Sequence, residues 1–236
     1  MQYRDRKLRF ELKYPATAAQ CEILRQRFAS AMTPDEHGGK YRVTSLYLDD
    51  IYMSAYNDKL LGGDVRKKYR IRTYNLDEKL LRFECKYKDR EMTSKRSMWI
   101  NKEMYYRILD GDFFFAGAPE LEGSVLWDAS VSNSLARLRP SVIVDYNREA
   151  FINREGNVRF TIDSGFKVGV FSDDMLSDRV RYIPVTESPA VVEIKYDELL
   201  PVHLADLIQG VKLERAAFSK FLICRDKLSE MHKSVY

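Results

Sequence analysis

Cysteine and histidine are scarce in this sequence, and the few that occur are scattered. The 236 residues include three cysteines (Cys21, Cys85 and Cys224) and three histidines, without metal-ligand spacing. An odd number of isolated cysteines predicts neither a disulfide framework nor a zinc site, and is typical of a reducing compartment. The sequence has no apolar run long enough to cross a bilayer and no signal-peptide pattern. We therefore expect a cytoplasmic protein.

The common nucleotide-binding and hydrolytic motifs are also missing. Gly38-Gly39-Lys40 lacks the spacing of a P-loop, and no Gly-x-Gly-x-x-Gly sequence occurs. Gly-x-Ser-x-Gly and His-Glu-x-x-His are absent as well. A nucleotide, if bound, would have to be held by side chains on strands instead of by a glycine-rich loop.

Charge of both signs is abundant, although the net charge is small. The chain has 39 basic and 35 acidic residues, for a formal net charge of +4. This balance excludes a general polyanion-binding surface, so any anion site must come from the local placement of charge. Basic and acidic residues also alternate on the same strand faces, which is unfavourable for tracking a nucleic-acid backbone. We expect no nucleic-acid partner.

The hydrophobic pattern predicts one β-rich domain without a linker that would divide it. A period of two predicts strands at residues 8–14, 42–48, 69–74, 81–88, 141–146, 158–163 and 191–196. Helices are predicted after Thr17 as N-cap and at residues 102–109, 127–138, 201–208 and from 215 onward. Residues 172–189 are predicted to form an extended loop.

One short pattern, Glu-x-Lys-Tyr, occurs three times, beginning at Glu11, Glu84 and Glu193. Residues two apart on a strand point to the same face, so each glutamate shares a face with its lysine. Neighbouring residues extend these rows of charge, and the alternate positions are apolar. The rows are Arg9, Glu11 and Lys13; Lys68, Arg70 and Arg72; Arg82, Glu84, Lys86 and Lys88; and Arg159, Thr161 and Asp163.

Such two-faced strands fit either an open sheet with its charged face in water or a barrel with a charged interior. Arginines two residues apart on a strand, such as Arg70 and Arg72, repel each other unless an anion is bound. The strands are also numerous enough to close. We therefore predict an α+β fold over residues 1–236, an antiparallel closed β-barrel of about eight strands. Helices would wrap its apolar outer face around a mostly basic tunnel.

A tunnel of this composition favours a phosphate ligand. Arginine recognises phosphate through two parallel hydrogen bonds, and lysine supplies a mobile point charge. A bare carboxylate repels phosphate, so the glutamates need a separate role. A Mg²⁺ or Mn²⁺ ion supplies one, because it binds a carboxylate on one side and phosphate oxygens on the other.

The ordered set of strand sequences resembles the VTC domain, a branch of the triphosphate tunnel metalloenzymes. The resemblance covers nearly the whole chain and is carried by residues 9–14 (RFELKY), 44–49 (TSLYLD), 67–72 (KKYRIR), 83–88 (FECKYK) with Lys95 and Arg96, 144–151 (VDYNREAF), 158–163 (VRFTID), 192–196 (VEIKY) and 218–221 (FSKF). It implies a charged tunnel with a glutamate-bound divalent metal. It also implies a polyphosphate polymerase that moves the terminal phosphoryl group of ATP onto a growing chain.

The resemblance also implies roles for individual residues. The catalytic residues would be Arg70, Arg72, Arg148, Arg159 and Lys195. Further phosphate-binding residues would be Lys13, Lys86, Lys95 and Lys220. Glu193 would be the main metal ligand, and Glu11 and Glu84 would assist the metal or hold neighbouring basic groups. The implied partners are ATP and polyphosphate, with a membrane-protein partner needed for export of the product; the oligomeric state stays open.

Other readings of the same residues remain. The tunnel could hydrolyse nucleotide or inorganic triphosphate, or it could bind polyphosphate or nucleotide without catalysis; an adenylyl cyclase fits less well. Lys95 fits an exposed loop as well as the tunnel, and Lys220 fits a solvated helix. Asp163 is expected either to orient Arg159 or to touch the metal. Arg66, Lys67 and Lys88 are expected at the surface or at the tunnel mouth.

Overall fold

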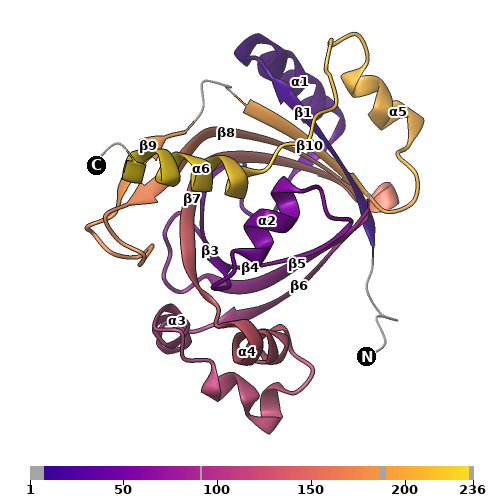
Figure 1. Cartoon of the computed structure of the whole chain (residues 1–236). Helices are drawn as coiled ribbons and strands as arrows, with labels where there is room; N and C mark the ends of the chain where they lie inside the picture. Colours follow the sequence, from indigo (N-terminus) through magenta and orange to yellow (C-terminus); the bar gives the residue numbers. More distant parts are fainter. Residues whose placement is uncertain (1–7, 91, 186–189, 234–236) are drawn as a thin grey trace.

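The computed structural model describes residues 8–90, 92–185 and 190–233 (Figure 1). The strands are β1 (Arg9–Ala16), β2 (Thr33–Pro34), β3 (Lys40–Asp49), β4 (Val65–Tyr74), β5 (Leu81–Asp89), β6 (Met92–Ile100), β7 (Arg139–Asn153), β8 (Val158–Val170), β9 (Arg181–Pro184) and β10 (Ala190–Tyr196). The α-helices are α1 (Ala18–Ala31), α2 (Ser54–Leu60), α3 (Lys102–Leu109), α4 (Val125–Ala136), α5 (Val202–Ala205) and α6 (Lys220–Lys233). Short 3-10 helices lie at η1 (Phe114–Gly117), η2 (Pro119–Leu121), η3 (Glu155–Asn157) and η4 (Asp206–Ile208).

Eight of the described strands follow one another around a ring (Figure 1). Their order is β7-β3-β4-β5-β6-β1-β10-β8, and hydrogen bonding between β7 and β8 closes the ring. Strands β2 and β9 extend the sheet from β7 and β8. Every neighbouring pair is antiparallel. The predicted α+β fold with an antiparallel ring of strands is confirmed.

The predicted apolar rows cover the outer face of the ring and pack under helices. Helix α1 begins after Thr17, whose side chain accepts a hydrogen bond from the backbone N–H of Gln20 in a capping box. Its buried face contacts the outer face of β8 and β10, in a cluster that contains Phe28, Phe160 and Val192. Helices α3 and α4 cover β4 and β5 in a second cluster. Figure 1 shows these two groups of helices on opposite sides of the ring.

Two helices pack against the inner face of the ring. The sequence had predicted helices on the outer face only. Helix α2 lies across the ring opening in Figure 1 and contacts β3, β4 and α6. Helix α6 packs on β7 and β8, where Phe221 and Cys224 are buried against Tyr146 and Val168. One part of the ring interior is therefore apolar and filled by helices.

A bulge explains why the inner face changes from charged to apolar. The register of β7 and β8 shifts opposite Ser164–Lys167, and Gly165 has φ +64°. A bulge inserts one residue and so exchanges the faces of the strand that follows. Arg159, Thr161 and Asp163 lie before it, whereas Phe166 and Val168 follow on the side that α6 covers. The period of two breaks here, so the predicted strand 158–163 was too short.

Other differences have local causes. Strand β6 was not predicted because its outer row contains Ser94 and Arg96, and Arg96 forms an ion pair with Asp128 of α4. Residues 215–219 are not helical, so the predicted C-terminal helix begins only at Lys220. The predicted loop at 172–189 contains strand β9; its last residues, 186–189, lie outside the described residues.

The three cysteines are free and buried. The sequence had predicted no disulfide framework. None of the helices in the described part of the chain has the length and apolar character that a membrane span requires.

We expect the side chains buried under α1 to contribute strongly to the free energy of unfolding. Phe28 is fully buried, with its ring centroid 4.7 Å from that of Phe160 and 5.6 Å from that of Phe151. Phe28→Ala should lower the free energy of unfolding by about 3–5 kcal/mol, because it leaves a cavity. Ile23→Ala, on the exposed face of the same helix, should cost less than about 1 kcal/mol. Urea denaturation measures both, and equal losses would contradict this packing.

Candidate functional site

A cavity of about 730 Å³ lies inside the ring and is lined by the charged rows and the start of α6. Its lining includes sixteen basic residues: Arg9, Lys13, Lys59, Arg66, Lys68, Arg70, Arg72, Arg82, Lys86, Lys88, Lys95, Arg148, Arg159, Lys195, Arg215 and Lys220. The acids in the lining are Glu11, Glu36 and Glu193. The predicted basic tunnel with a few acids is therefore present in the structure.

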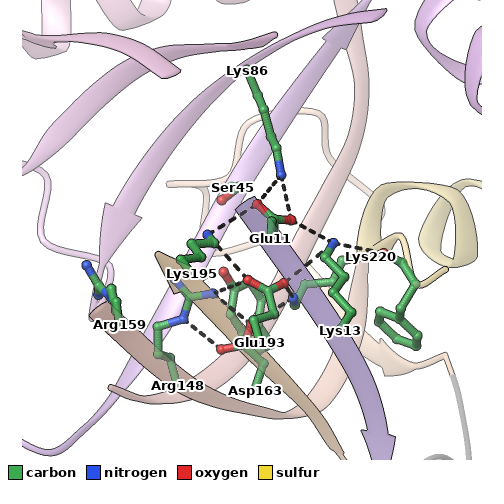
Figure 2. A network of polar contacts seen from close by, with 12 residues as sticks. Glu11, Lys13, Ser45, Lys86, Arg148, Arg159, Asp163, Glu193, Lys195 and Lys220 are labelled. Carbon is green, nitrogen blue, oxygen red and sulfur yellow. Dashed lines mark hydrogen bonds and ion pairs between the residues drawn. The ribbon is translucent and has the colours of Figure 1, made fainter. Parts of the chain in front are cut away.

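The repeated Glu-x-Lys pattern places opposite charges face to face. In the antiparallel register of β1 and β10, Glu11 lies opposite Lys195, and Lys13 lies opposite Glu193. Lys13 Nζ is 3.2 Å from Glu11 Oε1 and 3.6 Å from Glu193 Oε1. Lys195 Nζ is 3.6 Å from Glu11 Oε2 and 3.4 Å from Glu193 Oε2. Lys86 of β5, which only β6 separates from β1 in the ring, donates to both oxygens of Glu11 (Figure 2).

The two glutamates are ionised in this arrangement. Burial raises the pKa of Glu11, but Lys86, Lys195 and Lys13 outweigh it and hold the pKa well below its usual value. Burial likewise opposes ionisation of Glu193, and the neighbouring cations, with Lys220 first among them, hold its pKa well below the usual value. Both carboxylates are therefore available as anionic oxygen ligands.

A second cluster connects β7, β8 and α6. Arg148 donates from Nε and Nη2 to the two oxygens of Asp163, each at 2.7 Å. Lys220 Nζ lies 2.7 Å from Asp163 Oδ2 and 2.9 Å from Glu193 Oε1, and it also lies 5.0 Å from the ring centroid of Tyr146. Figure 2 shows these side chains beside the Glu11 and Glu193 pair. The carboxylates raise the pKa of Lys220 despite its burial, so Lys220 is a buried cation and not a solvated helix residue.

Glu84 belongs to a third cluster and does not line the cavity. It is fully buried and accepts hydrogen bonds from Arg70 Nε at 2.7 Å and from Lys95 Nζ at 2.8 Å. Arg70 also donates to the hydroxyl of Tyr47 at 3.0 Å. Lys95 lies on β6 and lines the cavity, so it is not a loop residue. The contacts of Glu84 fit the role of holding neighbouring basic groups.

Arg159 has a different partner from the one expected. Its Nη2 donates to Asp35 Oδ2 at 2.6 Å and to the hydroxyl of Tyr41 at 3.1 Å. Asp163 binds Arg148 and Lys220 instead, so the first of its two expected roles, orienting Arg159, was wrong. Asp35 lies in the segment between β2 and β3, and no pattern in the sequence indicated that it would reach the tunnel.

Another part of the cavity lining is basic, and its cations form no ion pair with an acid in the described part of the chain. Lys59 of α2 and Arg66 and Lys68 of β4 line it, and Lys68 Nζ lies 4.4 Å from the ring centroid of Phe221. Burial, reinforced by the charges of Lys59 and Lys86, lowers the pKa of Lys68 to about 7. Arg66 and Lys88 were predicted at the surface or tunnel mouth, and both line the cavity; Lys67 is exposed.

The structure brings the predicted basic residues together around one cavity. All nine line it: Lys13, Arg70, Arg72, Lys86, Lys95, Arg148, Arg159, Lys195 and Lys220. Their individual roles in binding and catalysis stay predictions. Sequence reasoning missed Tyr47 and Tyr146, whose hydroxyls accept from Arg70 and Arg72. Tyr47 shares a strand face with Ser45, which also accepts from Arg72, and this period of two was an available signal.

The carboxylates suit a divalent cation that is completed by substrate. Among the described residues, no group of three or more acidic, histidine or cysteine side chains converges. Glu11 and Glu193 do converge, since both contact Lys13 and Lys195. Mg²⁺ is commonly held by one or two carboxylates together with phosphate oxygens and water. These two glutamates therefore fit a metal bound jointly with a phosphate ligand, and Glu84 contributes to a separate cluster.

The comparisons with known proteins agree with this geometry. A family model described as the VTC domain matches residues 8–229. The chain belongs to the VTC-domain family. The triphosphate tunnel metalloenzymes, which include this family, generally use divalent metal ions. No curated protein matches the sequence.

Two solved structures show the same fold at low sequence identity. One is a putative adenylyl cyclase from Hippeastrum with a dominant triphosphatase activity, at 13% identity and a TM-score of 0.57, covering 93% of this chain and 95% of the other. Another is the PH1819 protein from Pyrococcus horikoshii, at 14% identity and a TM-score of 0.50, covering 94% and 98%. At these identities the likeness shows the fold, and it confirms the tunnel architecture that the resemblance implied.

Asp163 should be essential for stability because it neutralises two buried cations. Asp163→Asn should lower the free energy of unfolding by about 3–5 kcal/mol, as expected when one partner of a buried ion pair is removed. Asp112→Asn is a matched control, because Asp112 forms an exposed ion pair with Arg107 on the outer surface and should matter little. Chemical denaturation measures both variants. A stable Asp163→Asn protein would show that Arg148 and Lys220 do not depend on this carboxylate.

Anion binding should weaken as the pH rises from 7 to 9. Lys68 and Lys86 each have a pKa near 7; for Lys86, burial outweighs the attraction of Glu11. Below pH 7 both amines are mainly protonated and therefore charged. Above pH 7 the two lysines must take up protons when a phosphate chain binds. The affinity should fall by up to about tenfold per pH unit for each lysine that is reprotonated. Calorimetry with tripolyphosphate, in two buffers of different ionisation enthalpy, measures affinity and proton uptake.

Lysine variants separate this effect from titration of the ligand itself. Lys68→Met should reduce the measured proton uptake, whereas Lys67→Met removes the same charge from an exposed position on the same strand and should leave it unchanged. Identical proton uptake in the wild type and Lys68→Met would contradict a titrating tunnel lysine at position 68.

Proposed function

We propose that this domain is a metal-dependent polyphosphate polymerase, which transfers the terminal phosphoryl group of ATP to a growing polyphosphate chain. The observation that carries the proposal is the cation-rich tunnel of a VTC-family chain. Its basic lining continues past the Glu11 and Glu193 pair to Lys59, Arg66 and Lys68. Such a lining suits a phosphate chain longer than a triphosphate.

The side chains support phosphoryl transfer by positioning and charge stabilisation. A terminal oxygen of the polyphosphate chain would attack the γ-phosphorus of ATP, and the bond to the β–γ bridging oxygen would break, releasing ADP. Such a transfer depends mainly on positioning and on neutralisation of charge. Arg70, Arg72, Arg148 and Arg159 would stabilise the charge on the transferred group, and Lys195 would contact it. Lys13, Lys86, Lys95 and Lys220 would bind the remaining phosphates.

Glu193, assisted by Glu11, would hold Mn²⁺ or Mg²⁺. The metal, when bound, supplies neutralisation of the phosphate oxygens. The polyphosphate acceptor is an ionised oxygen and needs no general base. This agrees with carboxylates at Glu11, Asp163 and Glu193 whose pKa values lie below the usual range, because such groups are weak bases.

A triphosphatase is the second candidate, and the lysines favour it. Burial lowers the pKa of Lys86 to about 7 and that of Lys95 to about 8, although Glu11 and Glu84 oppose the shifts. A neutral amine in this range can accept a proton from water. Hydrolysis of nucleotide or inorganic triphosphate in the same tunnel would use such a base.

The proposed partners are ATP and polyphosphate, and the proposed compartment is the cytoplasm. Export of the product would require a membrane-protein partner.

The test is incubation of the protein with ATP and Mn²⁺, with and without a short polyphosphate primer. A ladder on a polyphosphate-stained gel is expected, while a parallel assay follows free phosphate. Glu193→Gln should lower the rate by about 100-fold or more, as does loss of a group that stabilises the transition state. Glu103→Gln, an exposed position on α3, is the matched control and should stay active. Free phosphate without a ladder would identify a triphosphatase. If neither a ladder nor free phosphate formed, both enzymatic proposals would be contradicted.

A further inference from the structure

A small group of aromatic rings lines the cavity beside Arg159. The imidazole of His37 stacks on Tyr74 with ring centroids 4.1 Å apart and an interplanar angle of 29°. The ring of Tyr41 lies 4.9 Å from His37 and packs edge-on against Tyr74 at 5.8 Å. His37 and Tyr74 both belong to the cavity lining. Tyr41 and Tyr74 are buried, whereas the His37 side chain remains 23% exposed.

A single carboxylate joins these rings to the basic lining. Asp35 accepts from the hydroxyl of Tyr41 at 2.7 Å, from Arg159 Nη2 at 2.6 Å and from the backbone N–H of His37 at 3.1 Å. The aromatic group is therefore held next to an arginine of the phosphate tunnel. Asp35 fixes the positions of His37 and Arg159 relative to each other.

Two further polar groups of this part of the cavity are available to a ligand. The Nε atom of Arg159 is buried without a hydrogen-bond partner. Glu36, which is 82% exposed at its side chain, also lines the cavity and lies 3.7 Å from His37 Nε2. The Arg159 Nε–H suits a phosphate oxygen, whereas a stacked aromatic face and an exposed carboxylate do not suit a phosphate chain by themselves. A ligand that carries a planar ring and a polar edge next to its phosphates would use them all.

We propose that His37 and Tyr74 form the binding subsite for the nucleobase of a nucleoside triphosphate, with its phosphates directed past Arg159 into the basic tunnel. The base would stack on the exposed imidazole of His37, and Glu36 would accept from an amino group on the edge of the base. This inference rests on the proposed function of the tunnel. With this subsite, the tunnel would select a nucleotide over inorganic triphosphate as its phosphoryl donor.

An aromatic side chain can stack on any nucleobase, and this stacking does not depend on the phosphates. Loss of one such platform typically lowers affinity by about 5- to 100-fold. The subsite should therefore change the affinity for a nucleotide while leaving the affinity for tripolyphosphate almost the same. A purely structural role of His37 would change both affinities together.

The experiment measures binding of adenosine 5′-(β,γ-imido)triphosphate and of tripolyphosphate by calorimetry with Mg²⁺, on the whole protein. His37→Ala should weaken binding of the nucleotide analogue by about 5- to 100-fold and of tripolyphosphate by less than about twofold. His37→Phe keeps a stacking surface and should stay close to the wild type. His203→Ala, at an exposed position outside the cavity lining, is the matched control.

The outcomes separate this inference from the proposed function. An unchanged affinity of His37→Ala for the nucleotide analogue overturns the subsite, while binding of tripolyphosphate still supports the tunnel. Equal losses for both ligands also overturn it, because they assign His37 a structural role. A wild-type protein that binds neither ligand contradicts the proposed function itself, and the subsite with it.

Discussion

The compensation of charge inside the ring is the constraint on which the rest of the structure depends. Sixteen basic residues line one cavity, and their mutual repulsion in a space of low dielectric would oppose closure of the sheet. Glu11 and Glu193 on adjacent strands, with Glu84 and Asp163 behind the lining, each contact two or more of these cations. The antiparallel register of β1 and β10 produces this arrangement, because it sets each glutamate opposite a lysine.

The compensation is uneven around the cavity, and this unevenness gives the site its chemical character. Near β1 and β10 the carboxylates line the cavity and converge, which suits a divalent cation. Around Lys59 and Lys68, burial, reinforced by repulsion between the ammonium groups, lowers the pKa of Lys68 to about 7. Near Arg159 the balancing carboxylate, Asp35, also holds aromatic side chains. The three regions favour a metal, a polyanion and a planar ring, respectively.

The apolar part of the interior depends on backbone geometry. The bulge at Gly165 exchanges the faces of β8, so that the inner row changes from Asp163 to Phe166 and Val168. Helix α6 packs on this apolar surface and thereby carries Lys220 to Asp163 and Glu193. A lysine from the last described helix thus completes a cluster that the strands begin. Its burial follows from the packing of Phe221 and Cys224 on the same helix.

The sequence by itself determined the two-faced strands and the basic rows that line the cavity, and its resemblance to the VTC domain implied the closed ring and three further cavity residues, Lys95, Arg148 and Lys220. The two faces follow from a period of two, which places alternate residues on opposite faces whatever their partners. The partners themselves were decided by tertiary structure. Asp163 contacts Arg148 and not Arg159, and Asp35 reaches Arg159 from 124 residues away. Ring closure, strand register and the bulge set these distances, and no local pattern encodes them, because each joins segments that are remote in the chain.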